Sequence, residues 1–104
     1  MRQRNIKNLD QKIRRNSTFL VTDPESCRGR WQEVFGNNAP VYLEIGCGKG
    51  RFIASRAAAF PEKNFIAVEG QSNVALRALQ KAELCHFDSR RIFIDYVDDL
   101  GRYF

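Results

Sequence analysis

The sequence predicts an α/β protein built on a parallel sheet, with its elements in the order β-α-β-α-β. Three short apolar runs, at residues 41–45, 64–69 and 91–95, alternate with two stretches of helical periodicity. The apolar runs are almost continuous, which is typical of parallel strands that helices cover on both faces. A glycine-rich turn follows the first run, as expected where a strand passes into a crossover helix.

Length and composition limit what the chain can be. With 104 residues it is large enough for one domain and one hydrophobic core. The hydrophobic fraction of 43% and the charged fraction of 28% are those of a globular protein. No apolar run of about 18 residues and no signal-peptide pattern is present, so we expect no membrane span and a cytoplasmic location. A complete doubly wound enzyme needs two β-α-β-α-β halves and exceeds this length.

Residues 1–40 are predicted to form a basic N-terminal extension with one or two helices. Apolar residues at helical spacing indicate a short first helix around Leu9. Asp23-Pro24 is a typical N-cap followed by proline at the first helical position, which predicts a second helix over residues 24–35, ended by Gly36. Its inward side chains are expected to be Trp31, Val34 and Phe35.

Residues 41–104 carry the predicted sheet and its two crossover helices. The first strand, residues 41–45, is followed by a helix over residues 51–60 that Pro61 stops. The second strand, residues 64–69, leads to a helix that begins at Ser72 as N-cap and runs to about Glu83. After the third strand, a last helical turn is expected within residues 97–104.

The net charge of +5 is concentrated at the N-terminus. Within the first fifteen residues only Asp10 opposes the basic side chains, which are Arg2, Arg4, Lys7, Lys12, Arg14 and Arg15. Such an arm suits a polyanion, and a nucleic-acid phosphate backbone is the obvious partner. A solvated tail without a partner explains the charge equally well.

The glycine-rich turn has the pattern Glu44-x-Gly46-x-Gly48-x-Gly50. Glycines let the backbone turn tightly and let a ligand approach where a Cβ would obstruct it. Glu69 ends the second strand, where an acid can accept hydrogen bonds from both hydroxyls of an adenosine ribose. Together, the loop and this acid predict an adenosine-type binding site.

The spacing of the loop favours one ligand over another. Nicotinamide enzymes prefer G-x-G-x-x-G with helix-terminal amides facing a pyrophosphate. Here the third glycine comes one residue earlier, and Glu44 stands two residues before the first glycine. A carboxylate there would repel a pyrophosphate but suits a ligand with a positive end. We therefore favour S-adenosylmethionine, with its amino group and sulfonium, over a nicotinamide cofactor.

Two further features have less definite interpretations. Asp95 ends the third strand, where a carboxylate can accept from the exocyclic amine of adenine, but Asp98 and Asp99 compete for this role or are solvated acids. The cysteines, Cys27, Cys47 and Cys85, are odd in number and lack C-x-x-C spacing, so neither a disulfide framework nor a metal site is expected.

The segments LEIGCGKG at residues 43–50 and FIAVEGQ at residues 65–71 resemble the bacterial tRNA (guanine-N7-)-methyltransferase family. The start MRQR, the Asp23-Pro24 pair and the FGN segment at residues 35–37 resemble it too. The resemblance implies a Rossmann-like, S-adenosylmethionine-dependent methyltransferase fold and methylation of N7 of a guanine in tRNA. It implies cofactor contacts by Glu44, Gly46, Gly48, Gly50, Glu69 and Asp95, and tRNA contacts by Arg2, Arg4, Lys7, Arg14 and Arg15.

The family continues into a fourth strand with an Asp-Pro-Trp-type motif, which is absent from these 104 residues. The expected content is therefore a basic extension, residues 1–40, and the cofactor-binding half of a methyltransferase domain, residues 41–104. We name no catalytic residue and expect the chain alone to lack turnover. A non-catalytic module that binds the cofactor or RNA, or another class I methyltransferase, remains the alternative. The first strand would be an exposed apolar edge, which predicts either self-association across that edge or a chain that is only marginally stable alone.

Overall fold

The computed structural model describes residues 6–46, 48, 50–85 and 88–104. The strands are β1 (Val41–Ile45), β2 (Asn64–Glu69) and β3 (Arg90–Ile94). The α-helices are α1 (Leu9–Arg15), α2 (Trp31–Phe35), α3 (Arg51–Ala59) and α4 (Ser72–Leu84). The described residues also include two 3-10 turns, η1 (Pro24–Cys27) and η2 (Leu100–Arg102).

The three strands form one parallel sheet in the order β1-β2-β3, which confirms the predicted α/β class. In the register, Leu43 lies opposite Ile66, and Val68 lies opposite Phe93. The first two strands have the predicted bounds, whereas β3 begins one residue earlier and ends at Ile94. Asp95 therefore lies just beyond the sheet, at the edge where all three strands end.

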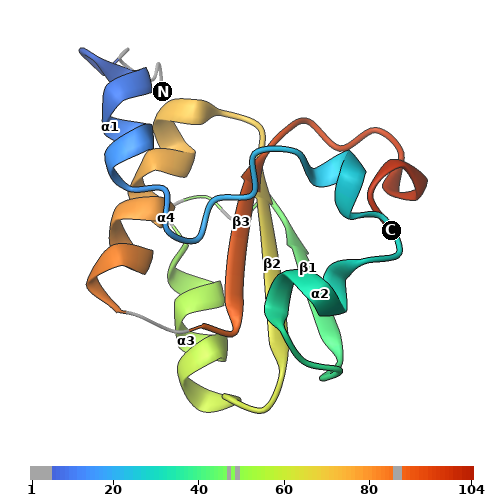
Figure 1. Ribbon diagram of the computed structural model, residues 1–104. Coiled ribbons are helices and arrows are strands. Elements are labelled where there is room, and N and C mark those ends of the chain that lie inside the picture. The colour runs from blue at the N-terminus through green and yellow to red at the C-terminus, as the bar shows by residue number, and fades with distance from the viewer. Residues whose placement is uncertain (1–5, 47, 49, 86–87) are drawn as a thin grey trace.

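Helices α3 and α4 cover one face of the sheet, while α2 and the C-terminal turn cover the other (Figure 1). The alternation of side chains along β2 accounts for this layering, because successive residues point to opposite faces. Ala67 packs toward α3 and α4, and Ile66 and Val68 pack toward Trp31 on the other face. Apolar side chains on both faces of β2 thus produce a core on each side.

The N-terminal segment passes around the outer edge of β3. Helix α1 packs on α4, and Thr18 donates from its backbone N and its hydroxyl to the Glu83 carboxylate, both at 2.9 Å. The chain then runs beside β3, where Leu20 forms a parallel bridge with Ile92. The Val21 N–H donates to the Ile92 carbonyl at 2.8 Å. These bonds satisfy backbone groups at the outer edge of β3.

The single helix predicted over residues 24–35 is wrong. The segment forms η1 and then α2, separated by residues 28–30. Gly29 has a φ of 73°, in the left-handed region, and this conformation interrupts a right-handed helix. Asp23 precedes Pro24 at the first helical position, but its side chain makes no capping hydrogen bond. Of the predicted inward side chains, Trp31 and Phe35 are buried, and Val34 is partly buried against the same cluster.

The structure also differs slightly from the prediction at the start of α4 and in the last helical turn. Gln71, in extended conformation, is the N-cap of α4, so Ser72 is its first helical residue and not its cap. The helical turn expected within residues 97–104 is the short η2. The Asp99 carboxylate accepts a hydrogen bond from the Gly101 N–H at 2.9 Å and fixes the start of that turn.

Strand β1 forms the other edge of the sheet, as predicted. Among the residues that the structure describes, no strand pairs with its outer side. Tyr42, Leu43 and Ile45 are 46%, 36% and 55% exposed. The first strand is therefore an open apolar edge, in contrast to β3.

Candidate functional site

The glycine loop lies where the parallel strands end. The Gly46 N–H donates to the Val68 carbonyl at 2.8 Å, which ties the start of the loop to β2. Gly46, Gly48 and Gly50 all have a positive φ, which glycine adopts without strain. A Cβ on Gly50 would lie 2.9 Å from the Ala78 Cβ, so this glycine also lets α3 begin close against α4. Cys47 and Lys49 lie outside the described residues.

Glu69 is held in place by two backbone donors. Its Oε1 accepts from the Gly48 N–H and its Oε2 from the Gln71 N–H, both at 3.0 Å. The carboxylate therefore joins the glycine loop to the turn that starts α4. A carboxylate has about four lone-pair positions, so each oxygen can still accept one more hydrogen bond. This leaves capacity for two neighbouring hydroxyl groups.

Glu44, near the end of β1, has different surroundings. Its Oε2 is buried and has no hydrogen-bond partner among the described residues. Burial raises the pKa of Glu44 above its ordinary value, because desolvation disfavours the ionised form. A buried acceptor without a partner costs free energy, and a positively charged donor from a ligand would remove that cost. This carboxylate suits an ammonium group.

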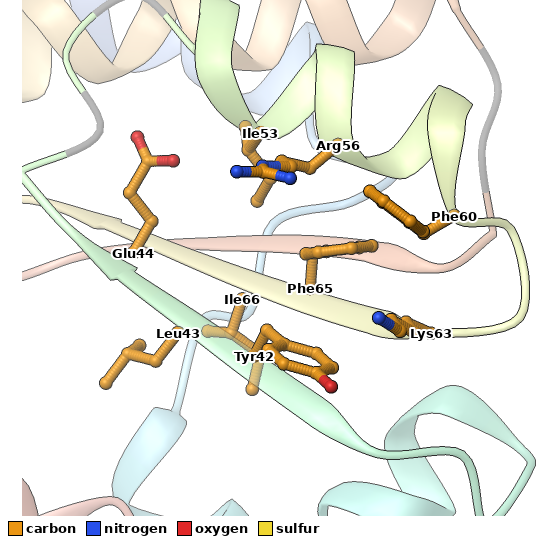
Figure 2. A pocket seen from close by; sticks show the side chains of 9 residues that line it. All are labelled: Tyr42, Leu43, Glu44, Ile53, Arg56, Phe60, Lys63, Phe65 and Ile66. Carbon is orange, nitrogen blue, oxygen red and sulfur yellow. The ribbon is translucent and has the colours of Figure 1, made fainter.

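A pocket of about 320 Å³ extends from Glu44 along the side of β1 that faces α3. Figure 2 shows Glu44 at one end and Lys63 at the other, with Tyr42 and Phe65 between them. The Lys63 ammonium lies 5.0 Å from the centre of the Tyr42 ring. The pocket follows the open edge of the sheet away from the glycine loop, so we assign only its Glu44 end to the candidate site.

Asp95 follows β3 directly and both of its oxygens are engaged. Its Oδ1 accepts from the Tyr96 N–H at 2.8 Å, and its Oδ2 accepts from the Tyr103 hydroxyl. The competing acids have local partners: Asp98 pairs with Arg102 at 3.2 Å, and Asp99 starts η2. Asp95 is therefore the acid that the fold holds at the strand ends.

Of the predicted RNA-contact residues, the structure describes Lys7, Arg14 and Arg15, which lie on or near α1. Arg2 and Arg4 lie outside the described residues. Lys7 precedes α1, and Arg14 and Arg15 end it, and all three side chains are exposed. No ion pair joins these three to any residue that the structure describes. Helix α1 packs on α4, so Arg14 and Arg15 lie on an element that is held against one of the helices covering the sheet (Figure 1).

Sequence reasoning missed three contributors to the site. The acids are held by the Gln71 N–H, the Tyr96 N–H and the Tyr103 hydroxyl. A turn after a strand-ending acid is a general signal for a backbone donor such as Gln71. Tyr103 carries no such local signal, because its contact with Asp95 depends on how the C-terminal turn packs.

The described residues contain neither a membrane-spanning helix nor a cluster of metal ligands. No helix in the described part of the chain is long and apolar enough to cross a membrane. No group of three or more His, Cys, Asp or Glu side chains in the same residues could hold a metal ion.

Comparison with known families gives a match over most of the sheet region. A family described as "Putative methyltransferase" matches residues 38–98. Glu44, Glu69 and Asp95, with the glycine loop between them, all fall within that range.

Several curated proteins named tRNA (guanine-N(7)-)-methyltransferase are similar to this chain. The one from Brevibacillus brevis is 51% identical over 83 residues, which are 80% of this chain and 38% of the relative. The one from Lachnoclostridium phytofermentans is 49% identical with the same coverage. The one from Geobacillus thermodenitrificans is 38% identical over 104 residues, which are 100% of this chain and 48% of the relative. The chain thus spans less than half the length of these relatives.

Proposed function

The chain belongs to the methyltransferase family that matches residues 38–98, and from this premise we propose that it binds S-adenosylmethionine and serves methylation of N7 of a guanine in tRNA. The substrate is inferred from the names of its relatives, which act on tRNA. A tRNA substrate also implies a cytoplasmic location.

One observation carries the choice of cofactor. The buried Glu44 Oε2 has no partner among the described residues, and it lies beside the glycine loop. A pyrophosphate would add like charge to this carboxylate, whereas an ammonium group would neutralise it. The residues therefore fit a ligand that is positively charged at this end. When bound, S-adenosylmethionine would supply a methyl group on a positively charged sulfur.

The other acids have complementary roles in the proposal. Glu69 would accept hydrogen bonds from the two ribose hydroxyls, using the lone pairs that Gly48 and Gln71 leave free. Asp95 would accept from the exocyclic amine of adenine, with its carboxylate oriented by Tyr103. The positive-φ glycines would let the ligand approach the backbone between these acids.

Transfer to guanine N7 needs no general base, because N7 carries an in-plane lone pair and no proton. The protein must instead place N7 in line with the bond to be broken and exclude water. Effective concentration contributes about 7–11 kcal/mol when this geometry is right. The basic segment at α1 would hold the tRNA through its phosphates. The described acids supply only the cofactor side of this arrangement.

The proposal is tested first by binding. The chain is titrated calorimetrically with S-adenosylhomocysteine and with NADH, and only the first is expected to bind. The Glu69→Ala variant should bind about tenfold to a hundredfold more weakly, since it loses acceptors that are charged. Glu62→Ala, at an exposed position between α3 and β2, is the matched control and should bind normally. Binding of NADH alone would overturn the cofactor assignment.

Turnover is tested separately with unmodified tRNA and labelled S-adenosylmethionine, followed by mass spectrometry for N7-methylguanosine. We expect the 104 residues to bind the cofactor without transferring its methyl group. Methylation by the chain alone would show that our expectation of inactivity is wrong and would confirm the activity. Methylation at a different atom of tRNA would favour another methyltransferase class.

A further inference from the structure

Tyr96 is the most exposed aromatic side chain in the described part of the chain. It is 71% exposed, whereas Tyr103 is fully buried. It follows Asp95 directly, at the edge where β2 and β3 end. Its hydroxyl makes no hydrogen bond to any described residue. Tyr96 belongs to neither hydrophobic core, so core packing does not explain a large aromatic side chain at this position.

The ring rests on the bare backbone of Gly70. A Cβ added to Gly70 would lie 2.3 Å from both Cδ1 and Cε1 of Tyr96 and 2.9 Å from Cγ. The ring therefore occupies the space that any other side chain at position 70 would need. Gly70 does not have a positive φ, so its backbone conformation does not by itself require glycine. The close approach of the ring is what requires it.

The position of the ring is fixed by the acids of the candidate site. Gly70 follows Glu69, whose carboxylate is held by two backbone donors. The Asp95 N–H donates to the Glu69 carbonyl at 3.1 Å, and the Tyr96 N–H donates to Asp95 Oδ1. The Tyr96 backbone is thus tied to the ends of both strands. The ring lies next to the acid that would hold the ribose.

We propose that Tyr96 is a stacking platform for the adenine ring of the cofactor. One side of the ring is supported by Gly70, and the high exposure leaves its other side open to a flat ligand. Every base has a π-face that can stack on an aromatic side chain. This inference rests on the proposed function only in that the ligand carries an adenosine. Gly70 and Tyr96 then act together, because the absence of a side chain at position 70 leaves the space that the Tyr96 ring occupies.

The test compares binding of S-adenosylhomocysteine and of NADH, both of which carry adenosine, to the full chain and its variants. Tyr96→Ala should weaken binding about 5- to 100-fold, and Tyr96→Phe should keep the wild-type affinity. Gly70→Ala, which displaces the ring, should weaken binding in the same direction. Leu84→Ala is the control, since Leu84 is 83% exposed and lies at the far end of α4. Circular dichroism melting checks that each variant folds.

Proton NMR of the bound ligand gives a readout specific to stacking. The adenine H2 and H8 resonances should move upfield with the wild type and with Tyr96→Phe, but not with Tyr96→Ala. Equal affinities for the wild type and Tyr96→Ala, without an upfield shift, would overturn the platform and leave the proposed cofactor intact. Binding of NADH alone, with the same dependence on Tyr96, would support the platform and refute the proposed cofactor. No binding of either ligand would overturn both.

Discussion

Glu44 and Glu69 are the same residue type near the ends of neighbouring strands, yet their surroundings differ. Both oxygens of Glu69 accept backbone hydrogen bonds, whereas Glu44 has a buried oxygen without a partner among the described residues. Desolvation raises the pKa of Glu44. Its ionised form is therefore poorly stabilised until a positively charged ligand is present.

This difference gives a prediction about stability and pH. Because the pKa of Glu44 is raised in the folded state, the folded chain holds this proton more tightly than the unfolded chain. Stability should fall as the pH rises from the ordinary range of glutamate through the raised pKa. In Glu44→Gln no carboxyl group ionises at this position, so stability is not lost in this way as the pH rises. The variant should be more stable than the wild type at pH 7 and about equally stable near pH 4. Urea unfolding at both pH values measures the difference.

The matched control is Glu62→Gln, which removes a carboxylate at an exposed position. Its stability relative to the wild type should change little between the two pH values. A Glu44→Gln effect that stays constant with pH would contradict the prediction. Glu44→Gln should also bind S-adenosylhomocysteine more weakly. A loss of affinity would show that Glu44 contacts the ligand and does not only contribute to the fold.

Asp95 and Tyr103 form a hydrogen-bonded pair at the end of β3. The hydrogen bond to Asp95, with a smaller contribution from desolvation, raises the pKa of Tyr103 to about 12. The phenol therefore stays protonated, and can donate to Asp95, in more alkaline solution than an ordinary tyrosine. This contact orients the carboxylate at the end of β3 and explains why a C-terminal residue matters to the site.

At the scale of elements, the two edges of the sheet differ. Residues 19–21 run beside β3 and bond to Ile92, but no described strand covers β1. A pocket opens on each face of β1, one lined by Tyr42 and Phe65 and the other by Leu43 and Phe104. A further strand could pair with the free edge of β1 and place its side chains in these two pockets.

The open edge predicts self-association of the 104-residue chain through β1. Sedimentation velocity over a range of concentrations should show reversible dimers or larger species. Leu43→Lys should shift the chain toward the monomer, because a lysine on an edge strand opposes pairing. Leu84→Lys places the same charge on an exposed residue of α4 and should leave association unchanged. A wild-type chain that stays monomeric at high concentration and unfolds cooperatively would refute this prediction.

At the scale of the whole molecule, unlike charges are separated. The basic segment of α1 packs on the outer side of α4, while Glu44, Glu69 and Asp95 gather at the ends of the strands. Exposed Lys and Arg side chains without ion pairs to described residues favour a polyanion. This separation fits the proposed function, in which the basic segment would hold the tRNA phosphates and the acids would hold a ligand with a positive end.

The role of the basic segment is tested by the salt dependence of tRNA binding. Arg14→Gln should weaken binding and reduce the slope of log affinity against log salt by about one, if its guanidinium contacts a phosphate. Arg28→Gln is the matched control: it removes the same charge from an exposed position between η1 and α2, and α2 covers the other face of the sheet (Figure 1). Fluorescence anisotropy with unmodified tRNA at several salt concentrations gives both slopes. Equal slopes for the two variants would contradict a specific role for α1.

The order of the strands and helices was predictable from the sequence, because apolar runs, glycines and prolines act over a few residues. The bounds of β1 and β2 and the burial of Trp31 follow from such local patterns. The helix expected over residues 24–35 failed because Gly29 adopts a left-handed conformation that the surrounding pattern did not reveal. Local chemistry therefore predicted the architecture but not every break in it.

The sequence by itself determined the parallel α/β arrangement and brought the strand-ending acids and the glycine loop to one edge. Only the tertiary structure decided how each acid is held: Glu69 by Gly48 and Gln71, and Asp95 by Tyr103. It also decided that Glu44 keeps a buried oxygen without a described partner and that the Tyr96 ring rests on Gly70. The Glu69–Gly48 and Gly70–Tyr96 contacts join residues far apart in the chain, and the energies of all these contacts depend on packing and burial, which no local pattern encodes.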